Sequence, residues 1–140
     1  MTIRIETAGG PLLRAKCAKR LHEHARREAP AVPGPVQAID LLARDESGRE
    51  VGLLCGRLAW GVLEIDALWV DPPARGRGAG GHLLRGAEER ARQAGCDAVL
   101  VSTYDFQAPG FYRRAGFREV GRMDTRGRQR IIFSKSLNSQ

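Results

Sequence analysis

The sequence predicts a single α/β domain in which helices flank a mixed, mostly antiparallel sheet of about seven strands. Three observations predict it. The chain has 140 residues, enough for one hydrophobic core but few for two independent domains. Its 42% hydrophobic and 28% charged residues are ordinary for a globular protein. Short apolar runs alternate along the chain with runs of helical spacing, in the order β-α-β-β-β-α-β-α-β-β.

The first half of the chain predicts one strand, one helix and a three-stranded meander. Residues 2–7 alternate between apolar and polar side chains, as a short strand does, and two glycines then interrupt them. Pro11 suits the first turn of a helix whose apolar side chains fall four residues apart, and a Pro/Gly-rich loop follows at residues 30–35. Turn signals separate three runs rich in Val, Ile and Leu, which are residues 36–45, 51–60 and 62–70.

The second half predicts two helices and three strands. Apolar side chains at helical spacing run from Leu83 to Ala94, and Gly95 is a natural helix stop. Residues 97–103 form an almost unbroken apolar run, which is typical of a central strand covered on both faces. Residues 108–116 predict a short helix closed by a glycine. Residues 117–123 and 128–137 predict a final pair of strands joined by a polar loop.

The charge of the chain favours an anionic partner. The formal net charge is +7, which suits either nucleic acid or a phosphorylated small molecule. The arginines are spread along the chain and no zinc-finger spacing or RNA-binding aromatic signature is present. The basic charge is therefore the sole support for nucleic-acid binding, which ranks below the other functions considered.

The sequence indicates neither a membrane protein nor a disulfide framework. It has no run of about 18 apolar residues and no apolar block of the kind that a signal peptide needs, so we expect a soluble cytoplasmic protein. Cys17, Cys55 and Cys96 stand alone, and we expect small buried side chains, with a catalytic cysteine as the minor alternative. The histidines lack metal-ligand spacing, so no metal is expected.

Four glycines precede the second predicted helix, at positions 76, 78, 80 and 81. Unpaired N–H groups at a helix N-terminus bind anions, because the positive end of the helix dipole lies there. Glycine lets a ligand approach this backbone closely. Arg75 and Arg77 add positive charge. The segment therefore predicts a site for phosphate or pyrophosphate.

Two of the three known glycine-rich phosphate motifs fit poorly. A P-loop needs a lysine followed by a serine or threonine, and His82 and Leu83 follow the last glycine instead. The dinucleotide fingerprint is matched literally by Gly76, Gly78 and Gly81, but three antiparallel strands precede it here where one early strand and helix are required. The third motif is an arginine or glutamine followed by spaced glycines, and residues 75–80 satisfy it.

A second motif lies downstream, separated from the first by one apolar strand. Residues 105–117 read "DFQAPGFYRRAGF", with Asp105 at a position that is often Asn. With the two motifs at this distance, the sequence resembles the GNAT superfamily of N-acyltransferases, clearly so from Val62 to Phe117. The resemblance implies the GNAT fold over residues 1–140 as a single acyl-CoA N-acyltransferase domain, although the first helical region is shorter than in many members.

The resemblance also implies where acetyl-CoA binds. The pyrophosphate would lie on the glycine loop, and the pantetheine would pair with the backbone of residues 62–70 where that strand separates from the next. Asp105 would support the coenzyme or begin the following helix. The implied coenzyme-binding residues are Leu68, Trp69, Val70, Arg75, Gly76, Arg77, Gly78, Ala79, Gly80, Gly81, Asp105 and Tyr112.

The implied catalytic residues are Tyr112 and Glu64. Tyr112 stands at the family's usual acid position, where a phenol with a reference pKa of about 10 stays neutral at pH 7 and protonates a thiolate. Tyr104 is the reserve candidate. Glu64 matches a position from which some members deprotonate the amine through water, and Asp66, two residues on, would share its face of a regular strand and bind the ammonium. Which of the two carboxylates is the base stays open.

The expected reaction is direct transfer of an acetyl group from CoA to a primary amine in a ternary complex. A small amine is the preferred acceptor, and a protein N-terminus or lysine is the alternative. A CoA-binding regulatory module without turnover is the alternative of another class. A homodimer is possible for this family, but one sequence does not reveal a self-complementary surface.

Overall fold

The computed structural model describes residues 1–31 and 36–138, in two units that cover Met1–Pro33 and Gly34–Gln140. In the first unit, helix α1 (Pro11–Glu28) begins at the predicted proline. The predicted strand at residues 2–7 is wrong, because this segment has no regular structure. Alternation alone does not make a strand without a partner for the backbone groups, and Ile3 and Ile5 are 72% and 88% exposed. Of the predicted loop at 30–35, residues 32–35 lie outside the described residues.

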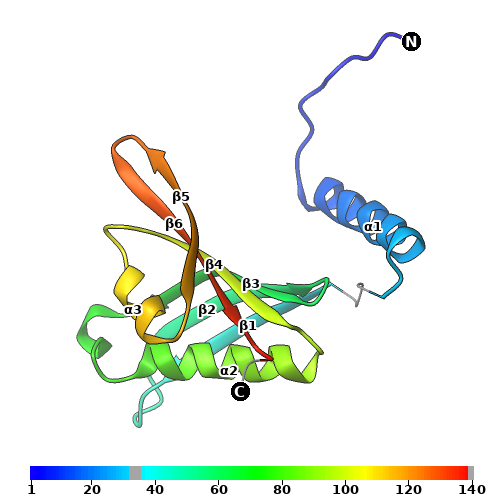
Figure 1. Ribbon diagram of the computed structural model, residues 1–140. Coiled ribbons are helices and arrows are strands. Elements are labelled where there is room, and N and C mark those ends of the chain that lie inside the picture. Colours follow the sequence, from blue (N-terminus) through cyan, green and yellow to red (C-terminus); the bar gives the residue numbers. More distant parts are fainter. Residues whose placement is uncertain (32–35, 139–140) are drawn as a thin grey trace. The chain divides into compact units, whose positions relative to one another are not determined.

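The second unit contains one mixed sheet with helices (Figure 1). Its strand order is β1-β2-β3-β4-β6-β5, and β3 and β4 form the parallel pair while the other recorded pairs are antiparallel. The predicted class is confirmed with six strands instead of about seven, because residues 2–7 do not form one. The elements are β1 (Gln37–Arg44), β2 (Glu50–Ala59), β3 (Val62–Val70), η1 (Pro72–Ala74), α2 (Ala79–Gln93), β4 (Ala98–Tyr104), α3 (Pro109–Arg114), β5 (Arg118–Thr125) and β6 (Arg128–Ser136).

Two tight turns set the register of the hairpins. Trp60 and Gly61 both have positive φ, at 56° and 78°, as a two-residue turn of type I′ requires. This turn places Arg57 directly opposite Glu64. Arg126 and Gly127 repeat the geometry, with φ of 55° and 78°. The last hairpin is therefore tighter than the four-residue loop predicted from the sequence.

A β-bulge in β3 changes which side chains face the core. Cys55 of β2 pairs with Ala67 and the next residue pairs with Ile65, so Asp66 is an extra residue in β3. Before the bulge, Ile65 is buried in the core. After it, the next side chain of β3 that packs against the core is that of Leu68, three residues on. The bulge thus reverses the alternation along β3 and leaves both Asp66 and Ala67 exposed.

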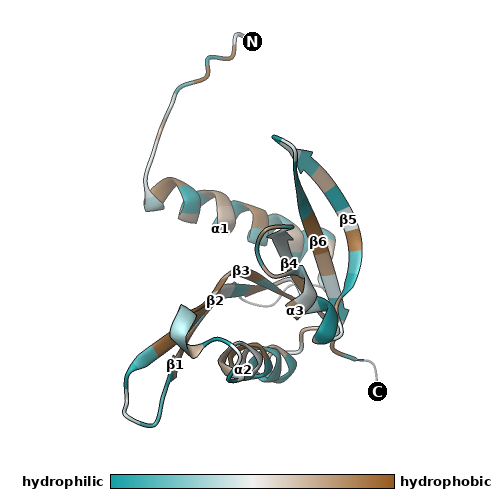
Figure 2. Ribbon diagram, turned by 90° about the vertical axis from the view of Figure 1, so that its left-hand side faces the viewer, coloured by the Kyte–Doolittle hydropathy of each residue, from teal (hydrophilic) through white to brown (hydrophobic). Residues whose placement is uncertain are grey.

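Helix α2 covers one face of the sheet and completes the core (Figure 1). Its buried apolar side chains are Leu83, Leu84, Ala87 and Ala91. They belong to one cluster with side chains from the central strands, among them Leu63 and Val99. The middle of β6 is strongly hydrophobic (Figure 2), and Ile131 and Phe133 there are buried. Within the described residues, no helix has the length and apolar character needed to cross a membrane.

The cysteines correct the expectation of three buried side chains. Cys96 is buried, but Cys17 and Cys55 are exposed, and all three are free. Cys55 follows the buried Leu54 on β2, so alternation directs it to the face opposite α2. Local desolvation and the neighbouring Asp40 raise the pKa of the Cys55 thiol, which makes it a poor nucleophile at neutral pH.

A buried ion pair joins α2 to β6. The Lys135 Nζ atom donates to both carboxylate oxygens of Glu88 at 3.2 and 3.0 Å, and the Glu88 side chain is only 4% exposed. Lys135→Met should lower the free energy of unfolding by about 2–4 kcal/mol, because it leaves a buried carboxylate without its partner. Denaturant unfolding followed by circular dichroism measures the change.

Two further variants control for this effect. Arg92→Met removes an exposed pair with Glu89, in which the atoms are 3.9 Å apart, and should cost less than about 1 kcal/mol. The double variant Glu88→Leu/Lys135→Met should recover most of the loss. Equal stability of Lys135→Met and wild type would show that the Glu88 charge is solvated in spite of its burial.

Candidate active site

The glycine loop ends in an exposed helix N-terminus. Gly78 is the N-cap of α2 with φ of +87°, and the first hydrogen bond of the helix runs from His82 N to Gly78 O at 3.0 Å. The N–H groups of Ala79, Gly80 and Gly81 therefore have no intrahelical acceptor. No side chain caps this end. A row of free donors at the positive end of a 15-residue helix is suited to bind phosphate oxygens.

Arg75 fastens the loop to the end of β3. Its Nε atom donates to the carbonyl of Val70 at 2.9 Å, and its guanidinium carbon lies 4.8 Å from the ring centre of Trp69. Trp69 in turn donates from Nε1 to Asp71 at 2.9 Å. Arg75 thus positions the loop through its side chain, while the neighbouring Arg77 is exposed beside the helix N-terminus.

Side chains that the sequence did not single out enclose this loop. A Cβ atom at Gly80 would lie 3.2 Å from the ring of Phe111, so α3 packs directly against the start of α2. A Cβ atom at Gly81 would lie 3.1 Å from a guanidinium nitrogen of Arg85. The Nδ1 atom of His82 is 2.8 Å from the carbonyl of Gly78. Arg85 and His82 therefore add basic groups to the loop. Each lies four residues after the glycine that it contacts, and this i, i+4 spacing was the available sequence signal.

The parallel strands β3 and β4 separate next to this loop. Their recorded pairing runs from Val62 with Ala98 to Ile65 with Val101 and ends there, although both strands continue. Beyond Ile65, the edge of β3 that faces β4 has no recorded strand partner. The separation coincides with the bulge at Asp66, which shifts the backbone of β3. Leu68, Trp69 and Val70 lie in the part of β3 that is separated from β4. The carbonyl of Val70 already accepts a hydrogen bond from Arg75.

A pocket of about 230 Å³ opens where the two strands separate. Its polar side chains are Glu64 and Asp66 from β3, Ser102 from β4 and Arg130 from β6, and apolar residues such as Leu100 and Ile132 line the rest. Glu64, Ser102 and Arg130 alternate with buried neighbours on their strands, so the pocket faces away from α2. We call it the outer-face pocket.

The two candidate carboxylates share one arginine. Arg57 Nη2 lies 3.1 Å from a carboxylate oxygen of Glu64, and Arg57 Nη1 donates to both oxygens of Asp66 at 3.0 and 3.1 Å. The structure therefore brings Glu64 and Asp66 together on one face, as the two-residue spacing predicted. Each carboxylate is about half exposed, at 45% and 47%, so both keep contact with water.

Tyr112 lies on the opposite face of the sheet, in the core between α3 and β6. It is 5% exposed, and its ring lies 5.9 Å from that of Phe133 and 5.5 Å from that of Phe117. Phe133 pairs with Val101, the last residue of β4 that is paired with β3. Tyr112 thus lies behind the point where the strands separate. Burial raises the pKa of Tyr112 to about 12, which keeps its hydroxyl protonated at neutral pH.

Asp105 binds the last hairpin and does not begin α3. Its carboxylate accepts from Arg128 Nε at 3.0 Å and from the backbone N–H of Gln129 at 3.2 Å. The N-cap of α3 is Ala108, and no side chain caps that helix. Gln107 is the polar residue that orders this turn, since its Oε1 atom accepts from Tyr104 N at 2.9 Å and from Thr103 Oγ1 at 3.1 Å.

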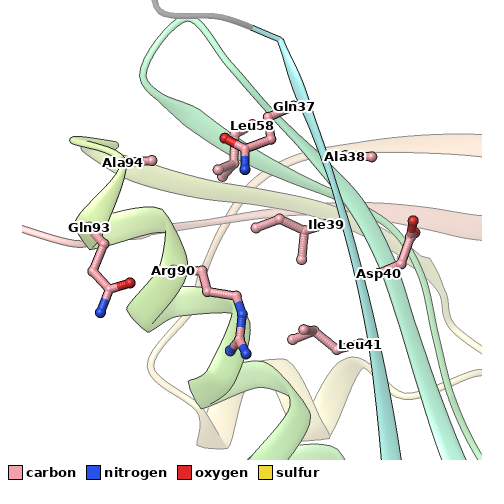
Figure 3. Close-up of a pocket in the computed structure, with 9 residues that line it drawn as sticks. All are labelled: Gln37, Ala38, Ile39, Asp40, Leu41, Leu58, Arg90, Gln93 and Ala94. Carbon is pink, nitrogen blue, oxygen red and sulfur yellow. The ribbon is translucent and has the colours of Figure 1, made fainter.

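A second pocket, of about 450 Å³, lies between β1 and the C-terminal end of α2 (Figure 3). Ile39 and Leu41 form one side, and Arg90 and Gln93 of α2 form the other. The glycine loop is at the other end of this 15-residue helix, roughly 20 Å away. Of these two pockets, the smaller outer-face pocket is the one at the strand separation, where the pairing of β3 with β4 ends. Residues 1–31 and 36–138 contain no cluster of His, Cys, Asp and Glu arranged for a metal.

Comparisons with known proteins show the family and the fold. The acetyltransferase (GNAT) family matches residues 14–117, more than half of the chain. Blasticidin-S acetyltransferase of Streptomyces morookaense is 45% identical over 96 residues, which are 67% of this chain and 71% of that protein. The crystal structure of an acetyltransferase from Bacillus cereus ATCC 14579 has a TM-score of 0.80 at 28% identity, covering 95% of this chain and 97% of that one.

A further solved structure contains the co-substrate. It is assigned as a streptothricin acetyltransferase of Bacillus anthracis in complex with acetyl coenzyme A, and its TM-score is 0.67 over 74% of this chain and 64% of that one. At 20% identity, this likeness shows the fold alone. The resemblance inferred from the two sequence motifs is confirmed. The chain belongs to the acetyltransferase (GNAT) family, whose co-substrate is acetyl-CoA.

Proposed function

We propose that the protein transfers the acetyl group of acetyl-CoA to a small primary amine, by direct attack in a ternary complex. The observation that carries this proposal is the free N-terminus of α2 beside the point where β3 and β4 separate. The outer-face pocket, at about 230 Å³, has room for a small amine. We also propose that residues 1–140 work as one domain, because the family match runs from α1 through α3.

The glycine loop suits the pyrophosphate of the co-substrate. The N–H groups from Arg77 to Gly81 would hold its oxygens, and Arg77 adds charge beside them. The open edge of β3 from Leu68 to Val70 would pair with the pantetheine through backbone groups other than the Val70 carbonyl, which accepts from Arg75. The bound thioester supplies the activated acetyl group. A cytoplasmic location, with its reducing conditions, fits the three free cysteines.

Glu64 and Asp66 would receive the amine. A primary amine is a cation at neutral pH, and it must lose a proton before its lone pair can attack. Arg57 compensates one of the two carboxylate charges, so the cluster keeps one net negative charge for the ammonium. We propose Glu64 as the base, acting through water, because it lies beside the last paired residues of β3 and β4. Asp66 would hold the ammonium.

Tyr112 would stabilise the departing sulfur from the other face of the sheet. The nitrogen–carbon bond forms as the carbon–sulfur bond breaks, one proton leaves the amine, and one proton reaches the sulfur. With a Tyr112 pKa of about 12, full proton transfer to a thiolate whose pKa is about 8.5 costs roughly 5 kcal/mol. The hydroxyl therefore serves chiefly as a hydrogen-bond donor to the developing charge, and the proton released by the amine completes the transfer through water.

Glu64→Gln should lower kcat at least tenfold, because the amide keeps the size of the side chain but cannot take the proton. Asp66→Asn should mainly raise KM for the amine. Each variant weakens one of the two exposed contacts of Arg57, so the stabilities of the two variants should be similar and each serves as the other's control. Release of the CoA thiol, measured at several amine concentrations, separates the two effects. A larger loss of kcat in Asp66→Asn than in Glu64→Gln would exchange the two roles.

A further inference from the structure

The outer-face pocket has walls of opposite charge. On the β3 side lie Glu64 and Asp66, and one arginine, Arg57, contacts both. Two carboxylates against one guanidinium leave one negative charge on this wall. In the proposed function, that charge receives the ammonium group of the acceptor.

Arg130 of β6 forms the positive wall. Its Nε and Nη2 atoms both donate to the hydroxyl oxygen of Ser102, at 3.1 and 2.9 Å. Among the residues that the structure describes, no carboxylate lies within salt-bridge distance of Arg130. Ser102 thus holds the guanidinium at the pocket without neutralising it, and the remaining N–H donors are free for an anion.

The surface between the two walls is apolar and short. β4 runs between β3 and β6, and its Leu100 lines the pocket together with Ile132 of β6. Strands two positions apart in a sheet are roughly 10 Å from each other, and the side chains shorten this gap. One small molecule with an ammonium group and an anion separated by a few methylene groups would contact both walls.

We propose that the acceptor is a primary amine that also carries an anionic group, with the ammonium against Glu64 and Asp66 and a carboxylate or similar anion against Arg130. The inference rests on the proposed function and adds the substrate class to it. A guanidinium offers parallel N–H donors that match a carboxylate, which gives the pocket orientation as well as affinity. A simple cationic amine would leave the Arg130 charge without a partner.

The test compares matched pairs of amines. β-Alanine, γ-aminobutyrate and ε-aminohexanoate are each assayed beside their own amides, which keep the chain length and remove the charge. For the wild type, the ratio of kcat/KM for acid over amide should reach about tenfold or more in at least one pair. In Arg130→Gln that ratio should fall to about one. Arg130→Lys should give an intermediate ratio, because it keeps the charge and loses the parallel donors.

Arg118→Gln is the matched control, since it removes the same charge from β5, a strand at the edge of the sheet and outside the pocket. It should leave the ratio unchanged. A wild-type preference for the amides, an equal ratio in wild type and Arg130→Gln, or turnover of no anionic amine would overturn the inference. Binding of acetyl-CoA, measured separately by calorimetry, distinguishes failure of this inference from failure of the proposed function. If acetyl-CoA does not bind, both the anionic acceptor and the proposed function are wrong.

Discussion

Replacing Gly78 with glutamate is expected to abolish acetyl-CoA binding. Gly78 is the N-cap of α2 with φ of +87°, a conformation that costs other residues about 1–2 kcal/mol. The added carboxylate would also stand beside the N–H groups that are free for the pyrophosphate, where it repels that anion and competes for the same donors. We expect the affinity for acetyl-CoA to fall at least a hundredfold in a calorimetric titration.

Two control variants distinguish the effect of a charge in the binding site from the effect of backbone strain. Gly48 has a nearly identical φ of +86° and open space around it, in the turn between β1 and β2, so Gly48→Glu introduces the same side chain away from the loop. It should bind acetyl-CoA as the wild type does. Gly78→Ala adds strain without charge and should lose less affinity than Gly78→Glu. Wild-type affinity in Gly78→Glu would remove the glycine loop from the binding site.

Replacing Tyr112 with phenylalanine should lower kcat at least tenfold while the affinity for acetyl-CoA is kept. The ring fills the same space among Phe111, Phe117 and Phe133, so the packing is retained and only the hydroxyl is lost. A donor aimed at a developing charge commonly contributes a tenfold to thousandfold factor in rate. Thiol release gives kcat, and calorimetry gives the affinity.

Tyr104→Phe is the comparison variant, because Tyr104 is the reserve candidate for the acid and lies on β4 with its ring stacked on Phe106. Our proposal gives the role to Tyr112 instead. Tyr104→Phe should therefore turn over as the wild type does. Since burial raises the pKa of Tyr112 to about 12, its ionisation should not limit activity below about pH 11. The pH profiles of wild type and Tyr112→Phe should then have the same shape over that range. Unchanged turnover in Tyr112→Phe would assign the support of the sulfur to another group.

Much of the candidate site followed from local sequence rules. The glycine loop and helix α2 followed from glycine spacing and helical periodicity, because both are set within a few residues. Even the contact between Arg57 and Glu64 was available, since a two-residue turn at Trp60 and Gly61 makes these side chains face each other. The register counted outward from this turn is what brings Arg57 opposite Glu64.

Other features depend on tertiary structure. The bulge at Asp66 reverses the alternation of β3, and no local pattern predicts an extra residue in one strand. The hydrogen bonds from Arg130 to Ser102 join side chains 28 positions apart and form only once β4 and β6 are neighbours. The apolar alternation at residues 2–7 is a strand signal that needs a partner strand before it becomes structure.

The most direct test of the account follows the acetyl group itself. The purified protein is incubated with acetyl-CoA and a panel of small amines that includes the anionic ones above, and the products are analysed by mass spectrometry beside thiol release. The account predicts one acetyl group on the amine nitrogen for each thiol released, with loss of both signals in Gly78→Glu. Tight binding of acetyl-CoA with no acetylated amine in the panel would contradict it and favour a CoA-binding regulatory module instead.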